Sequence, residues 1–259
     1  MARSIWNGVI SFGLVSIPVG LQTATQEKDL RFNQLHKVCG TRIKQQRFCP
    51  HCERLVETDE IEKGYEVSKN SYVIVNEEDF EALPVPSKHT IEVTAFVHHE
   101  EVDPIYFDTT YFLAPTETGR KPYKLLMKAL EEKGVCAVAK IAVRNKETLC
   151  LLRPSKGQVL LETLFYPDEI KEPEVKVEDV AVDDRELQMA LSLVALLEKP
   201  FDPAEHKDLY REELIKRIES KAQGGVLTSA PVPVETATID LMEALRRSLE
   251  DAEARKASG

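Results

Sequence analysis

Apolar residues alternate with polar ones along the first third of the chain, and this two-residue period predicts β-strands. The alternation over residues 11–22 runs in two phases that change at Val15 and Ser16. We interpret the stretch as one long strand with a bend or bulge at that point. Further strands are expected over residues 72–75, 90–97 and 111–113. Pro115 should end the last of them, because proline cannot donate to a strand ladder.

The hydrophobic period changes in the middle of the chain. Between Tyr123 and Leu130 apolar residues follow the i, i+3, i+4, i+7 spacing of an amphipathic helix, which should end near Gly134. Strand patterns resume over residues 135–143, 149–152 and 159–165. In the first of these runs Lys140 and Arg144 fall on the face opposite the apolar one. Strands with one central helix indicate a mixed α+β fold that is mainly β.

The last third of the chain is predicted to be helical. Residues 171–184 are charged and weakly patterned, so we place a domain boundary there. Beyond it, apolar faces predict helices over about 187–197 and 214–222, the second closed by Gly224 and Gly225. A flexible or extended linker follows over residues 224–237. Residues 238–256 again have the period of a helix.

This final helix carries an apolar surface that has no obvious core of its own. Its members are Ile239, Leu241, Met242, Leu245 and Leu249. An amphipathic helix at the end of a linker is suited to the groove of a partner protein. Packing of the helix onto the helices that precede it is the alternative, and the sequence leaves both open.

Charge is unevenly distributed along the chain. The net charge of −10 argues at first against a nucleic-acid-binding protein. Two segments, residues 28–54 and 120–156, are nevertheless strongly basic, while acidic residues concentrate between 168 and 219. Such separation can create a local positive field on an acidic protein. Two ordinary solvated faces would give the same pattern, so charge alone does not decide.

Composition and motifs limit the class of protein further. The sequence has no apolar run near the roughly 18 residues of a membrane span and no N-terminal signal segment. The common nucleotide-binding, zinc-protease and hydrolase motifs are absent, so we expect no enzymatic activity. Residues 98–101 (HHEE) are interpreted as a polar strand end and not as a metal cluster, because strand neighbours point to opposite faces.

Three of the five cysteines lie in one short basic segment, residues 36–52 (HKVCGTRIKQQRFCPHC). The segment has the spacing H-x2-C-x9-C-x2-C. The four candidate ligands are His36, Cys39, Cys49 and Cys52. This donor set fits a tetrahedral structural zinc ion, one per chain, with no open position for water. His51 is a rival ligand, and three unligated thiols beside a chance histidine are the alternative. Cys136 and Cys150 lie in strand patterns and are expected to be buried thiols.

Several separate strings resemble the bacterial Ku family. In chain order they are RSIWNGVISFGLVSIPV, HKVCGTRI, DPIYFDTTYFLAP, YKLLMKAL, VAKIAVRNKETLCLLRP and TLFYPDEIK, and the resemblance covers nearly the whole chain. It implies a ring-shaped, non-enzymatic homodimer that encircles double-stranded DNA ends in non-homologous end joining. It also implies a β-barrel core with an arching bridge, a helical arm, and recruitment of an ATP-dependent DNA ligase through the C-terminal region. Zinc is not implied by the family and depends on the residues named above.

The resemblance leads to a division of the chain. We assign residues 1–172 to the barrel core with a zinc-stapled bridge at about 28–65, residues 173–225 to the helical arm, and residues 226–259 to the linker and the ligase-recruiting helix. A protein that accepts any broken end must contact phosphates and not bases. The expected contacts are Lys37, Arg42, Lys44, Arg47 and Arg54 on the bridge, and Lys124, Lys128, Lys140, Arg144 and Lys146 on the core. This role implies a cytoplasmic protein on the nucleoid. A zinc-dependent enzyme and a zinc-bearing adaptor that binds only proteins are the competing hypotheses.

Overall fold

The computed structural model describes residues 4–81, 89–143, 146–173, 175, 180–224 and 241–258. The chain divides into two compact units, residues 1–172 and 173–259. Within the described residues, no helix is long and apolar enough to cross a membrane.

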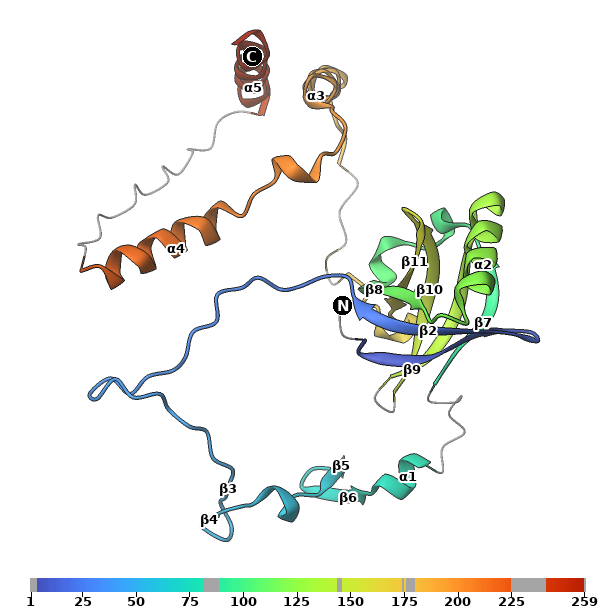
Figure 1. Cartoon of the computed structure of the whole chain (residues 1–259). Helices are drawn as coiled ribbons and strands as arrows, with labels where there is room; N and C mark the ends of the chain where they lie inside the picture. The colour runs from blue at the N-terminus through green and yellow to red at the C-terminus, as the bar shows by residue number, and fades with distance from the viewer. Residues whose placement is uncertain are drawn as a thin grey trace. The chain divides into compact units, whose positions relative to one another are not determined.

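The first unit is built on a closed barrel of strands (Figure 1). Its strands are β1 (Trp6–Phe12), β2 (Val15–Thr23), β7 (Thr90–Val97), β8 (Phe107–Pro115), β9 (Cys136–Val143), β10 (Lys146–Ser155) and β11 (Gln158–Leu164). The order around the barrel is β1-β2-β8-β11-β10-β9-β7. Only β1 and β7 run parallel among the described neighbours, and the other pairs are antiparallel. Closure leaves no free edge that could pair with another chain.

The barrel interior holds apolar residues that the alternating pattern predicted. Among the fully buried side chains are Ile10, Ile17, Val19, Leu21, Ile91, Leu113, Ile141, Leu152, Val159 and Leu161. The expected helix is α2 (Arg120–Lys133), and it ends as predicted at Gly134, which takes a left-handed φ of 66°. Cys136 and Cys150 are buried, with 3% and 0% of their surfaces exposed, which confirms the interpretation of both as buried thiols.

Tyr123 fastens α2 to the barrel wall. Its hydroxyl donates a hydrogen bond to the Leu113 carbonyl oxygen at 2.7 Å and accepts one from the Val159 N–H at 2.8 Å. A residue in the first turns of the helix therefore joins β8 to β11. Gly119 allows the close approach, because a Cβ at this position would lie 2.4 Å from the Pro18 carbonyl oxygen.

The stretch over residues 11–22 is two strands and not one. β1 ends at Phe12 and β2 begins at Val15, and the two pair as an antiparallel hairpin. Gly13 in the connecting turn has a φ of 58°, which glycine adopts without strain. The predicted bend or bulge is therefore wrong. The change of phase marks a two-residue turn, which reverses the chain before the second run of alternation starts.

Between β2 and β7 the chain leaves the barrel in a long excursion, residues 24–89. The excursion contains β3 (Phe48–Cys49), β4 (Arg54–Leu55), a 3-10 turn (Thr58–Glu60), β5 (Lys63–Ser68), β6 (Ser71–Val75) and α1 (Glu77–Glu81). None of its described residues is buried, and large apolar side chains such as Phe32 and Tyr65 are about 70% exposed. The described residues of the excursion therefore form no hydrophobic core that could hold their shape.

The second unit contains α3 (Asp184–Leu197), α4 (Leu209–Ala222) and α5 (Leu241–Ser258), and α3 packs against α5. Asp183 caps α3 by accepting a hydrogen bond from the Arg185 N–H at 2.8 Å. The helix has two apolar faces. One is half-buried and consists of Met189, Ala190, Leu193 and Leu196. The other is exposed and consists of Leu187, Leu191, Val194 and Leu197. The predicted linker from residue 225 onward, together with Ile239, lies outside the described residues.

Candidate metal site and nucleic-acid interface

The first half of the predicted metal site is a tight turn that carries His36 and Cys39. The turn is closed by hydrogen bonds from the Gly40 N–H to the His36 carbonyl and from the His36 N–H to the Thr41 carbonyl, both at 2.8 Å. Gly40 has a left-handed φ of 68°. The Nδ1 atom of His36 lies 3.0 Å from the Cys39 sulfur. Hydrogen bonds from Thr41 and His36 lower the pKa of the Cys39 thiol to about 7, which favours the thiolate that metals bind.

The second half of the predicted metal site is also a tight turn that carries two candidate ligands. Cys49 and Cys52 stand on the turn between β3 and β4, and Glu53 after them has a left-handed φ of 52°. The backbone N–H groups of Cys52 and His51 hydrogen-bond to the Cys49 sulfur and lower the pKa of that thiol. A hydrogen bond of the Cys52 thiol with the Cys49 sulfur raises the pKa of Cys52, and repulsion from a negatively charged Cys49 raises it further. Each turn therefore presents two donors three residues apart, followed by a left-handed residue.

These two turns form separate halves of a site. In the part of the chain that the structure describes, no group of three or more His, Cys, Asp or Glu side chains gathers closely enough to share an ion. The chemistry of the donors fits a structural zinc ion, since three thiols and an imidazole are a standard set. Assembly of the site would require the two turns to meet. The bound zinc therefore stays a prediction, and His51 is exposed in the second turn.

The basic residues of the excursion differ in their partners. Lys37, Arg42, Lys44 and Arg47 are exposed, and none has an ion pair among the described residues. Arg54 is different, because its guanidinium donates to both carboxylate oxygens of Glu60 at 3.0 and 2.6 Å. This pairing raises the pKa of Arg54 and lowers the pKa of Glu60. The unpaired side chains are free to neutralise an external anion, whereas Arg54 is already neutralised.

The predicted contacts on the barrel also divide into free and paired groups. Lys124 and Lys128 are exposed on α2 and have no ion pair in the described part of the structure. Lys140 donates to Glu147 at 2.8 Å, and this hydrogen bond raises the pKa of Lys140. The carboxylate of Glu147 therefore competes with any phosphate for this lysine. Arg144 and the side chain of Lys146 lie outside the described residues.

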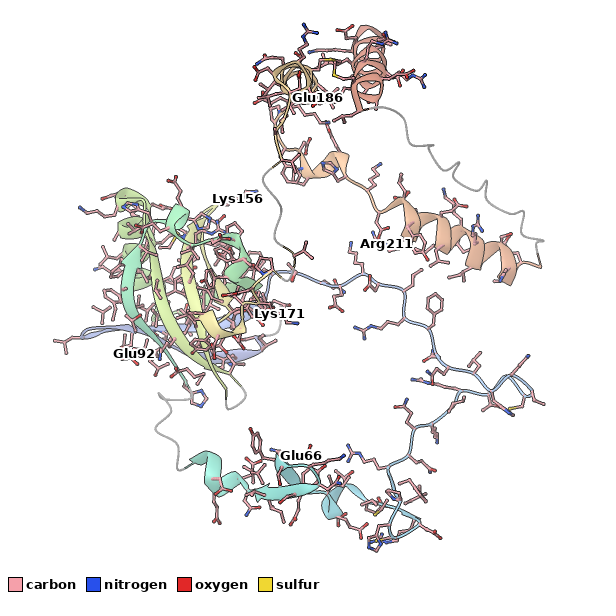
Figure 2. All side chains as sticks on the ribbon, turned by 180° about the vertical axis from the view of Figure 1, so that it is seen from behind. Glu66, Glu92, Lys156, Lys171, Glu186 and Arg211 are labelled. Carbon is pink, nitrogen blue, oxygen red and sulfur yellow. The ribbon has the colours of Figure 1, made fainter. Side chains whose placement is uncertain are left out.

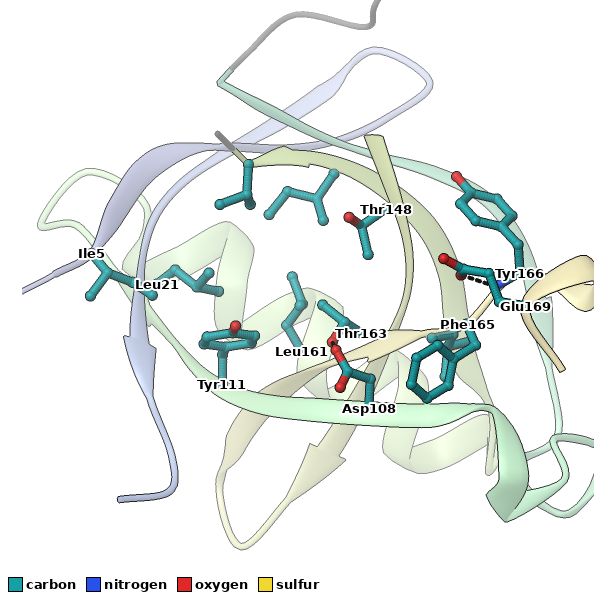
Figure 3. A pocket seen from close by; sticks show the side chains of 13 residues that line it. Ile5, Leu21, Asp108, Tyr111, Thr148, Leu161, Thr163, Phe165, Tyr166 and Glu169 are labelled. Carbon is teal, nitrogen blue, oxygen red and sulfur yellow. Dashed lines mark hydrogen bonds between the residues drawn. The ribbon is translucent and has the colours of Figure 1, made fainter. Parts of the chain in front are cut away.

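A pocket that the sequence did not indicate lies at one end of the barrel (Figure 3). Its volume is about 340 Å³, and Leu21, Tyr111, Leu161 and Thr163 are among the lining residues. Thr163 donates to Asp108 at 3.1 Å and accepts from the Thr109 N–H at 3.0 Å, where the β8–β11 register shifts. The Thr163 hydroxyl therefore gives the Thr109 N–H a hydrogen-bond partner at the point where the strand register is irregular. We assign the Thr163 hydroxyl a structural role at this register shift.

The C-terminal surface predicted to bind a partner is partly used within the chain. Met242, Leu245 and Leu249 are half-buried on α5, which packs on α3, whereas Leu241 is 57% exposed. Of the two alternatives that the sequence leaves open, packing of α5 onto a preceding helix is the one that the structure shows, because α3 contacts α5. The residue pattern alone could not show this, because it does not tell which apolar face of α3 packs against α5.

The structure is a closed seven-stranded barrel with a long excursion between β2 and β7, and residues 28–54 of this excursion are basic. This arrangement defines the class of the protein as a Ku-type β-barrel. The family model described as the Ku70/Ku80 beta-barrel domain matches residues 11–189. The chain belongs to the Ku family.

Curated relatives extend the match to almost the whole chain. A "Non-homologous end joining protein Ku" from Symbiobacterium thermophilum is 45% identical over 261 residues, which cover 99% of this chain and 65% of the relative. Proteins of the same name from Desulfitobacterium hafniense and Heliobacterium modesticaldum are 40% and 42% identical, with 87% and 92% of the relative covered. The chain thus spans about two thirds of the first relative and most of the other two.

Proposed function

We propose that this protein binds the ends of double-stranded DNA without sequence specificity, as a ring-shaped homodimer that carries out no catalysis. In this role it brings an ATP-dependent DNA ligase to the break during non-homologous end joining, on the nucleoid in the cytoplasm. The names of the curated relatives support the process. The exposed cations of this chain support binding of DNA through its phosphates.

One observation carries the proposal. The excursion leaves the barrel after β2 and returns at β7, and its described residues form no buried core. It exposes cations that have no ion-pair partner among these residues, including Lys37, Arg42, Lys44 and Arg47. Unpaired cations gain free energy at a phosphate backbone because they release condensed counterions from DNA. Phosphate contacts are alike for every sequence, so a protein that uses them accepts any broken end.

The zinc ion would act as a staple for this excursion. His36, Cys39, Cys49 and Cys52 would hold it, and the metal would supply a crosslink in place of a hydrophobic core. The two donor turns support this part of the proposal, because each places two donors at matching positions before a left-handed residue. Joining them would close a loop of chain that carries Arg42, Lys44 and Arg47, and would hold these cations in a defined arrangement.

The homodimer is supported by apolar side chains of the second unit that are exposed among its described residues. A helix with apolar residues on two faces usually buries both of them. On α3 the side chains of Leu187, Leu191, Val194 and Leu197 are between 46% and 64% exposed. On α4 Ile215 and Ile218 are 37% and 40% exposed. A second copy of the chain would bury these faces, and twofold symmetry would close a ring from two barrels and two excursions.

The ligase contact is assigned to α5. Leu241 is exposed while α5 stays packed on α3, whereas Met242, Leu245 and Leu249 are half-buried and would become fully accessible only when α5 leaves α3. Deletion of residues 236–259 should abolish stimulation of the ligase and leave DNA binding intact.

A competition experiment tests the DNA-binding part. A ring loads only at a free end, so linear duplex should compete well for the protein and covalently closed circles of the same sequence should compete poorly. A protein adaptor with no DNA function would bind neither form. Equal binding of both forms at the same salt concentration would show that the cations touch DNA without a ring.

A further inference from the structure

A lysine occupies a backbone position that lysine does not favour. β10 and β11 are joined by the two-residue turn Lys156-Gly157, in which φ is 48° and 77°. Two positive φ values are the requirement of a type I′ hairpin turn, in which Asn-Gly and Asp-Gly are preferred. A lysine is strained there, because its Cβ crowds the following carbonyl oxygen and its side chain does not make the local hydrogen bond by which Asn or Asp compensates.

Other turns of the chain use residues that tolerate this conformation. The β1–β2 turn has Gly13, the β5–β6 turn has Asn70 with a φ of 63°, and α2 ends at Gly134. Glu53 and Lys156 are the remaining non-glycine exceptions among the described residues, and Glu53 belongs to the second donor turn. The strain at Lys156 therefore needs an explanation outside the turn itself.

Interactions within the barrel do not provide that explanation. Lys156 is exposed and projects from the hairpin tip (Figure 2), and no hydrogen bond or ion pair is formed by its side chain within the described residues. Ser155 and Gln158 flank the turn, so the tip offers hydroxyl, ammonium and amide donors and no carboxylate. A tip of this kind is suited to an external anion.

The first turns of α2 lie at the same end of the barrel. Tyr123 holds them there through its hydrogen bond with Val159, three residues beyond Lys156, and α2 also packs against β10. The first turn of α2 has no acidic residue and no side-chain cap. Lys121, Lys124 and Lys128 follow one flank at spacings of three and four residues, and like charges at these spacings oppose helix formation. All three are exposed and have no ion pair among the described residues.

We propose that the β10–β11 hairpin tip is a contact for the DNA backbone, in which the Lys156 ammonium group binds one phosphate and the α2 flank with Lys121 and Lys124 binds others. The inference rests on the proposed function and adds a contact on the barrel itself to the cations of the excursion. A strained lysine and a row of like charges both weaken the free protein, and a bound phosphate offsets both. Counterion release favours a DNA backbone over an acidic protein surface as the partner.

The substitution Lys156→Asn separates binding from folding. Asparagine is preferred in this turn, so the variant should melt at a temperature about 2 °C higher than the wild type. For each copy that touches DNA, it should also bind linear duplex about eightfold more weakly at 0.1 M monovalent salt, and the slope of log K against log salt should fall by about 0.9. Lys156→Arg keeps the charge and should keep the wild-type slope.

Lys207→Asn is the matched control. Lys207 is exposed in a loop of the second unit, between Glu205 and Asp208, and the variant loses the same charge. Its DNA affinity should stay within about twofold of the wild type, as for a charge with no phosphate contact. The inference is overturned if Lys156→Asn binds DNA as tightly as the wild type or as the control variant.

Two further outcomes distinguish the ways in which the reasoning can fail. If Lys156→Asn lowers the fraction of dimer but not the DNA affinity of each dimer, the tip pairs with an acidic surface of a second copy, and the DNA contact is refuted. If the wild type itself does not bind linear duplex, the proposed function fails together with the inference. Wild-type binding with an insensitive Lys156→Asn variant refutes the inference alone.

Discussion

Removal of the unpaired cations of the excursion should reduce the salt dependence of DNA binding in proportion to the number of cations removed. Lys44→Ala and Arg47→Ala each remove a cation that has no ion-pair partner within the described residues. Removing one cation from one phosphate lowers the slope of log K against log salt by about 0.9, so a homodimer in which both copies touch DNA should show a decrease of about 1.8. At 0.1 M monovalent salt, one such cation–phosphate pair accounts for about an eightfold difference in affinity, or about 1.2 kcal/mol.

Arg54→Ala provides the control for this measurement. It changes the net charge of the chain by the same amount, but Arg54 already donates two hydrogen bonds to Glu60. Its effect on the slope should therefore be clearly smaller than the effect of the other two substitutions. The assay is fluorescence anisotropy of a short linear duplex over a series of salt concentrations. Equal slopes for all three variants would refute the reasoning, because a diffuse field and not individual contacts would then hold the DNA.

Four other predictions concern the metal, the barrel, the dimer and the ligase. Protein prepared without chelators should contain about one zinc ion per chain by elemental analysis, and Cys49→Ser should lose it; wild-type protein without metal would contradict the zinc assignment. Tyr123→Phe should reduce the free energy of unfolding by about 1–3 kcal/mol in urea titration, because a buried N–H of β11 and a carbonyl of β8 lose their partner; an unchanged midpoint would show that water replaces the hydroxyl. Leu191→Asp should shift the molar mass in light scattering from dimer to monomer, and a monomeric wild type would remove the basis of the ring. The variant without residues 236–259 should bind DNA normally but fail to stimulate the ligase, and normal stimulation would rule out α5.

Much of the barrel could be predicted because its signals are local. The strict alternation over residues 90–97 coincides with β7, and the helical period that ends at Gly134 coincides with the end of α2. A left-handed glycine after an amphipathic stretch is a signal that depends on neighbouring residues alone. The spacing of His36, Cys39, Cys49 and Cys52 is local in the same sense, and each pair does form a tight turn.

The parts that could not be predicted depend on residues far apart in the sequence or on a choice between two patterns. Gly13 marks a hairpin turn, but an alternation that changes phase is equally compatible with a bulge. Lys140 forms an ion pair with Glu147 on the neighbouring strand. The alternation of apolar and polar residues over 135–143 showed only that Lys140 faces away from the apolar side. Apolar residues cover two faces of α3, and only the packing of α5 shows which face is used within the chain.

The central claim is that a closed ring holds DNA by enclosing it, and a topological trap tests this most directly. The protein is loaded on linear duplex, both ends are then joined by ligation or blocked by bulky caps, and the salt concentration is raised until the cations no longer bind phosphate. The account predicts that protein stays on the DNA whose ends were closed after loading and leaves the DNA whose ends stay open. Equal release from both would contradict it.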